Sequence, residues 1–177
     1  MTRRIRLFGN LVGRGLIFVW FLMIATVVFF NLRLYSSSPL AKKDDDVPPM
    51  LLAQLAANRA ALDAGSPSRM QALFPEGYYF SYLFHGLAWV ELAMRDPSYS
   101  EQATQEAFWC LAKLDSPQGR APFPPHLPPD HGMFYSAWKC SLRAGVVVVQ
   151  QGGDASQISE LRNECDAIVL AIQALLK

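Results

Sequence analysis

The sequence predicts an all-α fold: a single N-terminal transmembrane helix, followed by antiparallel helix hairpins that form a partial (α/α) toroid. Three observations lead to this prediction. An uncharged apolar run covers residues 16–30. From residue 48 onward, apolar residues recur every three or four positions, which is typical of one face of a helix. The later helical segments also form two similar pairs, and helix hairpins are the unit from which toroids are built.

The apolar run is the expected membrane segment. It contains one hydroxyl group and no charge, and it follows four arginines: Arg3, Arg4, Arg6 and Arg14. Its 15 residues fall short of the roughly 20 that a spanning helix needs, but apolar neighbours extend it on both sides. A cleaved signal peptide is the alternative, because its apolar region has about 7–15 residues. Ser36 and Ser38 would suit cleavage, whereas Pro39 disfavours it, so an uncleaved anchor is the preferred interpretation.

The flanking charges predict how the chain lies in a cell membrane. More basic residues precede the apolar run than follow it, which favours a cytoplasmic N-terminus. A single pass then places the C-terminal domain on the outer side, periplasmic or extracellular. The expected organisation is a cytoplasmic stub and anchor at 1–35, a flexible Ser-, Pro- and charge-rich linker at 36–49, and a helical-hairpin domain at 50–177.

Composition excludes several function classes for the hairpin domain. From residue 48 onward there are nine Lys or Arg and twelve Asp or Glu, with no basic cluster, so no nucleic-acid partner is expected. No cofactor motif or metal-ligand spacing is present, so no cofactor and no metal is expected. The cysteines at 110, 140 and 165 are widely spaced and lie in helical patterns. They are interpreted as small buried side chains, while a disulfide between two of them stays open for an oxidising compartment.

Five helices are expected in this domain, over 48–65, 76–95, 98–114, 130–151 and from 154 to the end. Asp154 and Gln157 have the spacing of a capping box. The valines at 146–149 favour a strand locally, but no partner strand is evident, so they are assigned to the fourth helix. In the third helix, Glu101, Gln105 and Glu106 are expected mostly outside, and six residues inside: Ala103, Ala107, Phe108, Cys110, Leu111 and Leu114.

The core is expected to include Leu87, Leu111, Leu142 and Ile168. Most aromatic residues are assigned to it as well: Tyr78, Phe80, Trp89, Phe108, Trp109, Phe134 and Trp138. His85 lies mid-helix among aromatic residues and is interpreted as a core histidine with satisfied hydrogen bonds.

A faint internal repeat supports the hairpin interpretation. Residues 74–81 can be laid over residues 129–136, so that Gly77 matches Gly132 and, further along, Leu87 matches Leu142. In both copies a proline and an acid precede the glycine, and an aromatic-rich helix follows. The period of 55 differs from the 34 of tetratricopeptide arrays.

Four strings carry a resemblance: FPEGYYF at 74–80, GLAWVELA at 86–93, RAPFPP at 120–125 and GMFYSAW at 132–138. With them, residues 69–151 resemble a group of uncharacterised bacterial membrane-anchored proteins whose hairpin pattern is similar to that of (α/α)-toroid enzymes. The resemblance implies a membrane-anchored toroid and assigns no catalytic residue. Residues 171–177 are still in helical phase without a capping glycine. We therefore expect an N-terminal part of a longer protein, whose missing C-terminal hairpins, or a protein partner, cover the last helix.

Candidate catalytic residues gather around the repeated helix starts. Glu76 and Asp130 open helices at equivalent places, His131 adjoins Asp130, and Tyr79 and Tyr135 lie one turn along. A histidine, two carboxylates and two tyrosines suit general acid–base chemistry on a sugar or polyol. The alternative is that each acid complements a helix dipole.

Two functions stay open. The first is an N-terminal part of a toroid enzyme that acts on an envelope carbohydrate or a lipid-linked substrate. The second is a non-catalytic helical-hairpin scaffold for other membrane proteins. The proline-rich loop at 116–129 is interpreted as a rigid lid anchored by Phe123, with polyproline docking of a partner as its alternative.

Overall fold

The computed structural model describes residue 15, residues 18–32 and residues 47–176. Every regular element in this part of the chain is helical, so the all-α prediction is confirmed. The chain divides into two compact units, Met1–Asp46 and Val47–Lys177.

The first unit contains an apolar helix over residues 18–32. Its two polar side chains bond back to the helix, Thr26 Oγ1 donating to the Leu22 carbonyl at 2.8 Å and Asn31 Nδ2 to the Val27 carbonyl at 2.9 Å. None of the helices within the described ranges combines the length and the apolar character that crossing a membrane requires. The rest of the expected anchor, at 1–14, 16–17 and 33–35, and the linker at 36–46 lie outside those ranges.

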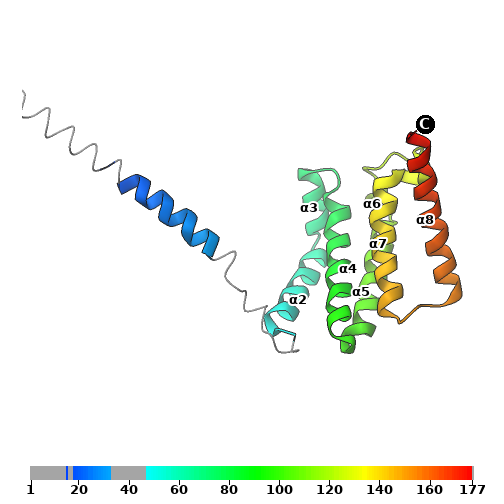
Figure 1. The fold of residues 1–177 in the computed structure, drawn as a ribbon, viewed down its shortest axis with the longest axis horizontal. Helices are drawn as coiled ribbons and strands as arrows, with labels where there is room; N and C mark the ends of the chain where they lie inside the picture. The colour runs from blue at the N-terminus through cyan, green and yellow to red at the C-terminus, as the bar shows by residue number, and fades with distance from the viewer. Residues whose placement is uncertain (1–14, 16–17, 33–46, 177) are drawn as a thin grey trace, which may run out of the picture. The chain divides into compact units, whose positions relative to one another are not determined.

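The second unit is a stack of helices (Figure 1). Its longer helices are α2 (Pro49–Asp63), α4 (Gly77–Arg95), α5 (Ser100–Leu114), α7 (Met133–Val149) and α8 (Ala155–Leu175). Shorter elements join them: α3 (Ser66–Leu73), η2 (Pro97–Tyr99), α6 (Pro117–Arg120) and η3 (Pro128–Gly132). The five expected helices are present, including the valine run in α7. The short helices α3 and α6 were not expected.

Local chemistry explains several helix ends. Asp154 accepts a hydrogen bond from the Gln157 amide, and the Gln157 side chain bonds back to the Asp154 amide, so the expected capping box at the start of α8 is confirmed. Asp96 precedes Pro97, which ends α4, and its carboxylate accepts from the Ser98 amide. Gly65 adopts φ 81°, which turns the chain from α2 into α3.

The main helices pack as two hairpins, α4 with α5 and α7 with α8. Helix α7 also packs on both α4 and α5, whereas α8 packs mainly on α7 and η3. Helices α2 and α3 lie against α4 on the other side of the stack (Figure 1). Gly86 allows close packing where α4, α5 and α7 meet, because a Cβ there would lie 2.9 Å from a Leu142 methyl and 3.2 Å from Cys110 Cβ.

The core differs from the expected one in its aromatic members. Tyr78 and Trp89 are buried as expected, and so are Leu111 and Leu142. Leu87 and Ile168 are half-buried. Phe108, Phe134 and Trp138 are exposed, so their assignment to the core was wrong. Each lies on a helix whose buried side is already filled by other residues, among them Leu111 on α5 and Leu142 on α7.

The proline-rich segment is anchored as expected. Phe123 is buried, and its ring centre lies 5.0 Å from that of Tyr79 and 5.2 Å from that of Tyr135. These contacts fasten the connection between α6 and η3 to both hairpins.

A polar network fastens α2 to the first hairpin. Arg59 of α2 lies 3.5 Å from the centre of the Trp109 ring and donates to Glu106 at 2.6 Å. Glu106 also lies 3.2 Å from His85 Nε2, and Asn58 Nδ2 lies 3.1 Å from His85 Nδ1. Because a carboxylate only accepts, Nε2 carries the proton and Nδ1 accepts from Asn58. His85 is therefore a satisfied core histidine, as expected, whereas the placement of Glu106 on the outer face was wrong.

We expect this histidine to make the second unit less stable in mild acid. Burial lowers the pKa of His85 below 6.5, and the hydrogen bond with Glu106 only partly offsets it. Below about pH 6.5 the His85 side chain is therefore protonated in the unfolded chain and stays neutral in the folded chain. Because the unfolded state then binds more protons, the free energy of unfolding is highest above that pH and decreases as the pH falls towards the lowered pKa. Urea unfolding of the Val47–Lys177 unit between about pH 8 and pH 5.5 measures the slope. His85→Gln should reduce the slope of stability against pH, and His126→Gln, at an exposed site, should leave it unchanged. An unchanged slope in His85→Gln would contradict the assignment of the pH dependence to His85.

Candidate functional site

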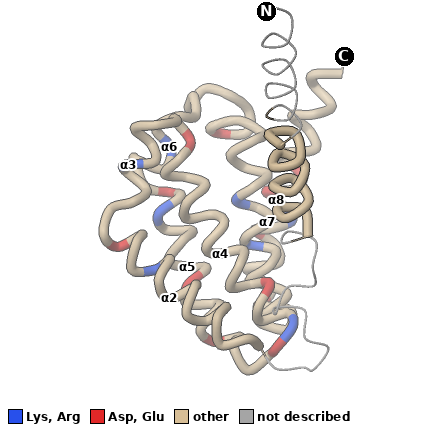
Figure 2. Tube along the Cα trace, turned by 90° about the vertical axis from the view of Figure 1, so that its left-hand side faces the viewer, with Lys and Arg blue, Asp and Glu red and all other residues tan. Residues whose placement is uncertain are grey.

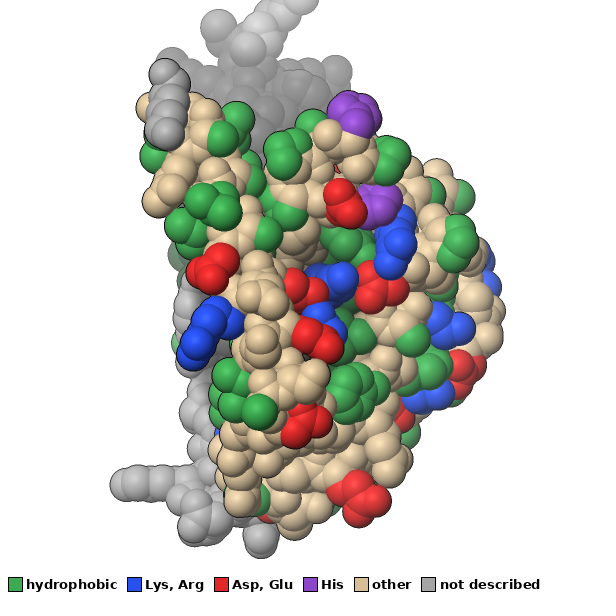
Figure 3. Space-filling model, turned by 90° about the vertical axis from the view of Figure 1, so that its right-hand side faces the viewer, with side chains coloured by type: hydrophobic (Ala, Val, Ile, Leu, Met, Phe, Trp, Pro, Cys, Tyr) green, Lys and Arg blue, Asp and Glu red, His purple; other side chains and the backbone are tan. Residues whose placement is uncertain are grey.

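A polar cleft of about 490 Å³ lies where the second hairpin meets the end of the first. Its polar lining comes from the C-terminal end of α5 and from α6, η3, α7 and α8, and it comprises Asp115, Arg120, Asp130, His131, Tyr135, Ser136, Lys139 and Glu164. Figure 3 shows a face of the molecule on which acidic and basic side chains lie intermixed, with histidine near its upper edge. Along the helices as a whole, residues of both signs are distributed without segregation (Figure 2).

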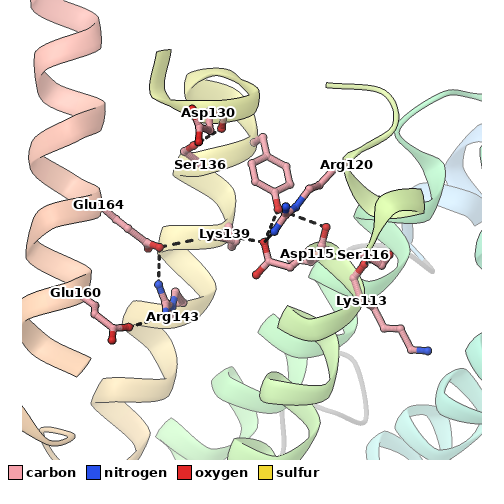
Figure 4. Close-up of polar contacts among 12 residues, drawn as sticks. Lys113, Asp115, Ser116, Arg120, Asp130, Ser136, Lys139, Arg143, Glu160 and Glu164 are labelled. Carbon is pink, nitrogen blue, oxygen red and sulfur yellow. Dashed lines mark hydrogen bonds and ion pairs between the residues drawn. The ribbon is translucent and has the colours of Figure 1, made fainter. Parts of the chain in front are cut away.

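Several polar side chains of this cleft converge on Asp115 (Figure 4). It caps the C-terminal end of α5, and its Oδ1 accepts from three side chains. The donors are Tyr135 Oη at 2.7 Å, Arg120 Nη2 at 3.0 Å and Lys139 Nζ at 3.1 Å. Tyr135 and Lys139 are four residues apart on α7, so both reach the same carboxylate from one face of that helix.

These donors keep the Asp115 carboxylate ionised. Burial by itself would raise the pKa of Asp115, but the Tyr135 hydrogen bond and the Lys139 and Arg120 charges outweigh it and hold that pKa below its usual value. Burial and the hydrogen bond to Asp115 raise the pKa of Tyr135. Near neutral pH the pair is therefore a fixed carboxylate and a neutral phenol, which suits ion pairing better than proton transfer.

A second set of ion pairs joins α7 to α8 on the same side. Arg143 donates to Glu164 and, at 3.0 Å, to Glu160, and Lys139 Nζ lies 4.0 Å from Glu164 Oε1 (Figure 4). Lys139 therefore connects Asp115 of the first hairpin with Glu164 of the second. The other carboxylate oxygen of Glu164, Oε2, is buried and has no hydrogen-bond partner among the described groups.

His131 has the geometry of a possible base. Its backbone adopts φ 66°, in the left-handed region that non-glycine residues seldom occupy. Its Nδ1 lies 3.0 Å from the Phe123 carbonyl oxygen, which only accepts, so the neutral tautomer that fits this contact has its proton on Nδ1 and a lone pair on Nε2. Proton abstraction from a ligand hydroxyl in the cleft is chemistry that this tautomer allows.

The structure brings together only part of the candidate catalytic set. Asp130, His131 and Tyr135 line the polar cleft. Tyr79 is fully buried and donates its hydroxyl to the Tyr135 carbonyl at 2.7 Å, so it does not line the cleft. Glu76 is half-buried at the start of α4 and is not among the lining residues. General acid–base catalysis by these residues stays a prediction.

The sequence interpretation missed the charged residues that organise the cleft, namely Asp115, Arg120, Lys139 and Glu164. The four-residue spacing of Tyr135 and Lys139 could have suggested one of the contacts. No sequence pattern indicates that Asp115 lies opposite Tyr135 and Lys139, because that contact joins two hairpins.

A second surface of note is an aromatic face, which we define as Phe74, Phe80, Phe84, Phe134 and Trp138. Phe80 is its centre, with ring centres 5.3 Å from Phe84, 5.8 Å from Phe134, 6.2 Å from Phe74 and 6.3 Å from Trp138. The outer members are 36–55 % exposed. The face therefore presents connected aromatic rings from α4 and α7, and from the end of α3, to the surface.

The aromatic face continues into an apolar groove of about 620 Å³ between α2, α3 and α4. Phe74, Phe80 and Phe84 belong to both. Leu73, 82 % exposed, and Met70, 46 % exposed, also line the groove, and Arg69 is the one charged residue among the described residues that line it.

Comparison of the chain with protein-family models, curated proteins and solved structures gives no match. The resemblance to membrane-anchored toroid-like proteins therefore stays a prediction.

Proposed function

We propose that the chain is a single-pass membrane-anchored scaffold, whose helical domain binds an amphipathic helix of another membrane protein through the aromatic face. The observation that carries the proposal is the connected set of exposed rings on α4 and α7 beside the apolar groove. In this proposal the two hairpins are successive units of a partial (α/α) toroid, in which α4 and α7 are equivalent helices.

Exposed rings of this kind have a free-energy cost that a partner would remove. Large connected apolar patches are uncommon on monomeric soluble domains and mark binding surfaces. Phe84 and Phe134 are each more than half exposed, although Phe84 stacks on the half-buried Phe80 and Phe134 meets that ring edge to face. Aromatic side chains also provide large contact areas with little loss of rotamer entropy on binding.

The groove suits a helix better than a polar ligand. It is bordered by three helices, and its walls carry Leu62, Met70, Leu73 and the shared phenylalanines. An amphipathic helix laid in such a groove would bury its apolar face by the usual helix-in-groove mode.

The apolar N-terminal segment supports the membrane tether. The polar atoms of Thr26 and Asn31 bond to carbonyls of their own helix, which satisfies them without water. The proposal places the N-terminus in the cytoplasm and the helical domain on the outer side, and the linker would keep that domain within reach of membrane partners.

The polar cleft supports catalysis less than the aromatic face supports binding. Its principal carboxylate, Asp115, is committed to three donors, and Glu164 is committed to Arg143 and Lys139. The contacts of Asp115 with Tyr135 and Lys139 join the two hairpins, and those of Glu164 join α7 to α8, which gives both sets a structural role.

A crosslinking experiment tests the proposal. A photoreactive amino acid replaces Trp138 on the aromatic face or, as the control, exposed Ala112 on α5. The full chain is expressed in cells and the membranes are washed with alkaline carbonate. We expect the chain to stay in the membrane and position 138 to give a discrete adduct with one membrane protein.

Two matched variants complete the design. Phe84→Ser should abolish the adduct, and Phe108→Ser, which removes an exposed phenylalanine from α5, should leave it. Adducts with lipid or with a second copy of the chain, or equal adducts from position 112, would refute the scaffold proposal. A soluble chain that begins near Pro39 would refute the anchor.

A further inference from the structure

Two of the three cysteines lie face to face across the second hairpin. Cys140 Sγ on α7 is 3.2 Å from Cys165 Sγ on α8, and both are free thiols. A disulfide has sulfurs about 2.05 Å apart, so the thiols are roughly 1 Å from bonding distance. We propose that Cys140 and Cys165 form a disulfide that closes the α7–α8 hairpin when the chain meets a disulfide oxidant. The proposal is independent of partner binding at the aromatic face.

The two cysteine residues have different exposure, which sets the order of the reaction. Cys165 is exposed, whereas Cys140 is buried. Burial, together with the neighbouring Cys165 thiol, raises the pKa of Cys140 to about 12, so Cys140 is a poor first nucleophile. Cys165, as its thiolate, attacks one sulfur of the oxidant and releases the first thiol of the oxidant.

The second step closes the ring. Cys140 loses its proton and attacks the Cys165 sulfur of the mixed disulfide, which expels the second thiol of the oxidant. Overall, two protein thiols become one disulfide, and the oxidant disulfide is reduced to two thiols. A small-molecule disulfide such as oxidised glutathione supplies this exchange.

The proposed disulfide would restrain helix α8 against the rest of the unit. Helix α8 is the outer helix of its hairpin and packs mainly on α7 and η3. The link between α7 and α8 contains Gly152 and Gly153 with positive φ, and the ion pairs of Arg143 with Glu160 and Glu164 flank the cysteines. A covalent bond between residues 25 positions apart would stop α8 from separating.

Intact mass measurement of the full chain in detergent tests the proposal. Incubation with oxidised glutathione should lower the mass by two hydrogen atoms relative to the dithiothreitol-treated chain, and peptide mapping should place the bond between Cys140 and Cys165. Amide hydrogen exchange in α8 should slow by roughly tenfold in the oxidised form, because opening of the hairpin is suppressed.

Three serine variants separate the outcomes. Cys165→Ser should prevent the mass loss, Cys140→Ser should stop at a glutathione adduct on Cys165, and Cys110→Ser, which alters a buried thiol on α5, should behave as the unmodified chain. A glutathione adduct that persists in the unmodified chain, a bond that involves Cys110, or unchanged exchange in α8 would overturn the proposal.

Discussion

Replacing Leu142 with alanine is expected to lower the free energy of unfolding of the Val47–Lys177 unit by about 3–5 kcal/mol. Leu142 is fully buried on α7, and its methyl groups lie over Gly86 of α4 beside Cys110 of α5. The three helices that meet there hold both hairpins together. Truncation would remove buried methyl groups and leave a cavity that three packed helices cannot easily close.

Urea unfolding followed by tryptophan fluorescence measures this change. Leu170→Ala is the matched control, because Leu170 on α8 is 65 % exposed and its truncation should change the free energy of unfolding by less than about 0.5 kcal/mol. Equal effects of the two substitutions would show that α7 does not pack on both α4 and α5 as described.

Replacing Tyr79 with alanine is expected to destabilise the same unit by about 3–5 kcal/mol. Its side chain is fully buried, and its ring contacts those of Phe123 and Tyr135, with centres 5.0 Å and 5.3 Å away. Its hydroxyl donates to the Tyr135 carbonyl at 2.7 Å. One residue thus connects the first hairpin, the proline-rich segment and the second hairpin.

Tyr79→Phe separates the ring from the hydroxyl. It keeps the packing and loses one hydrogen bond, so its cost should be near 1 kcal/mol in the same urea titration. A structural role for Tyr79 requires that Tyr79→Ala lower the free energy of unfolding more than Tyr79→Phe does. If Tyr79→Ala left stability within about 0.5 kcal/mol of the unmodified unit, the position of Tyr79 in the core would be wrong and its candidacy as a catalytic residue would regain weight.

Helix positions were predictable from the sequence because their causes are local. Asp96 with Pro97 ends α4, and Asp154 with Gln157 starts α8 through hydrogen bonds within four residues of chain. The valine run was assigned correctly to a helix, since it continues the apolar side of α7, where Leu142 and Val146 are buried. Helix α3 was missed because its eight residues have little apolar periodicity, and it is held in place by packing on α4.

Burial was predicted less well, because helical periodicity shows that a residue is apolar without showing which neighbour covers it. Phe134 and Trp138 follow the helical pattern of α7 and yet lie on the aromatic face. Glu106 was placed outside for its charge, although Arg59 and His85 compensate that charge where α2 meets the hairpin. Cys165 was expected inside and is exposed.

The last helix illustrates the same limit. The last helix was expected to be covered by further hairpins or by a protein partner, and Val169, Leu170, Ile172 and Leu175 on it are 44–73 % exposed. An additional hairpin or a protein partner over this surface stays a prediction.

The sequence by itself determined the helical class, most helix boundaries and the apolar N-terminal segment, because each depends on residues that are neighbours along the chain. Only the tertiary structure decided which side chains share a site. Asp115 meets Tyr135 and Lys139, Phe80 meets Phe134, and Cys140 meets Cys165 through contacts between residues 20 to 54 positions apart. Such contacts depend on the rotation and the register of one helix on another, which side-chain packing fixes and a one-dimensional pattern does not contain.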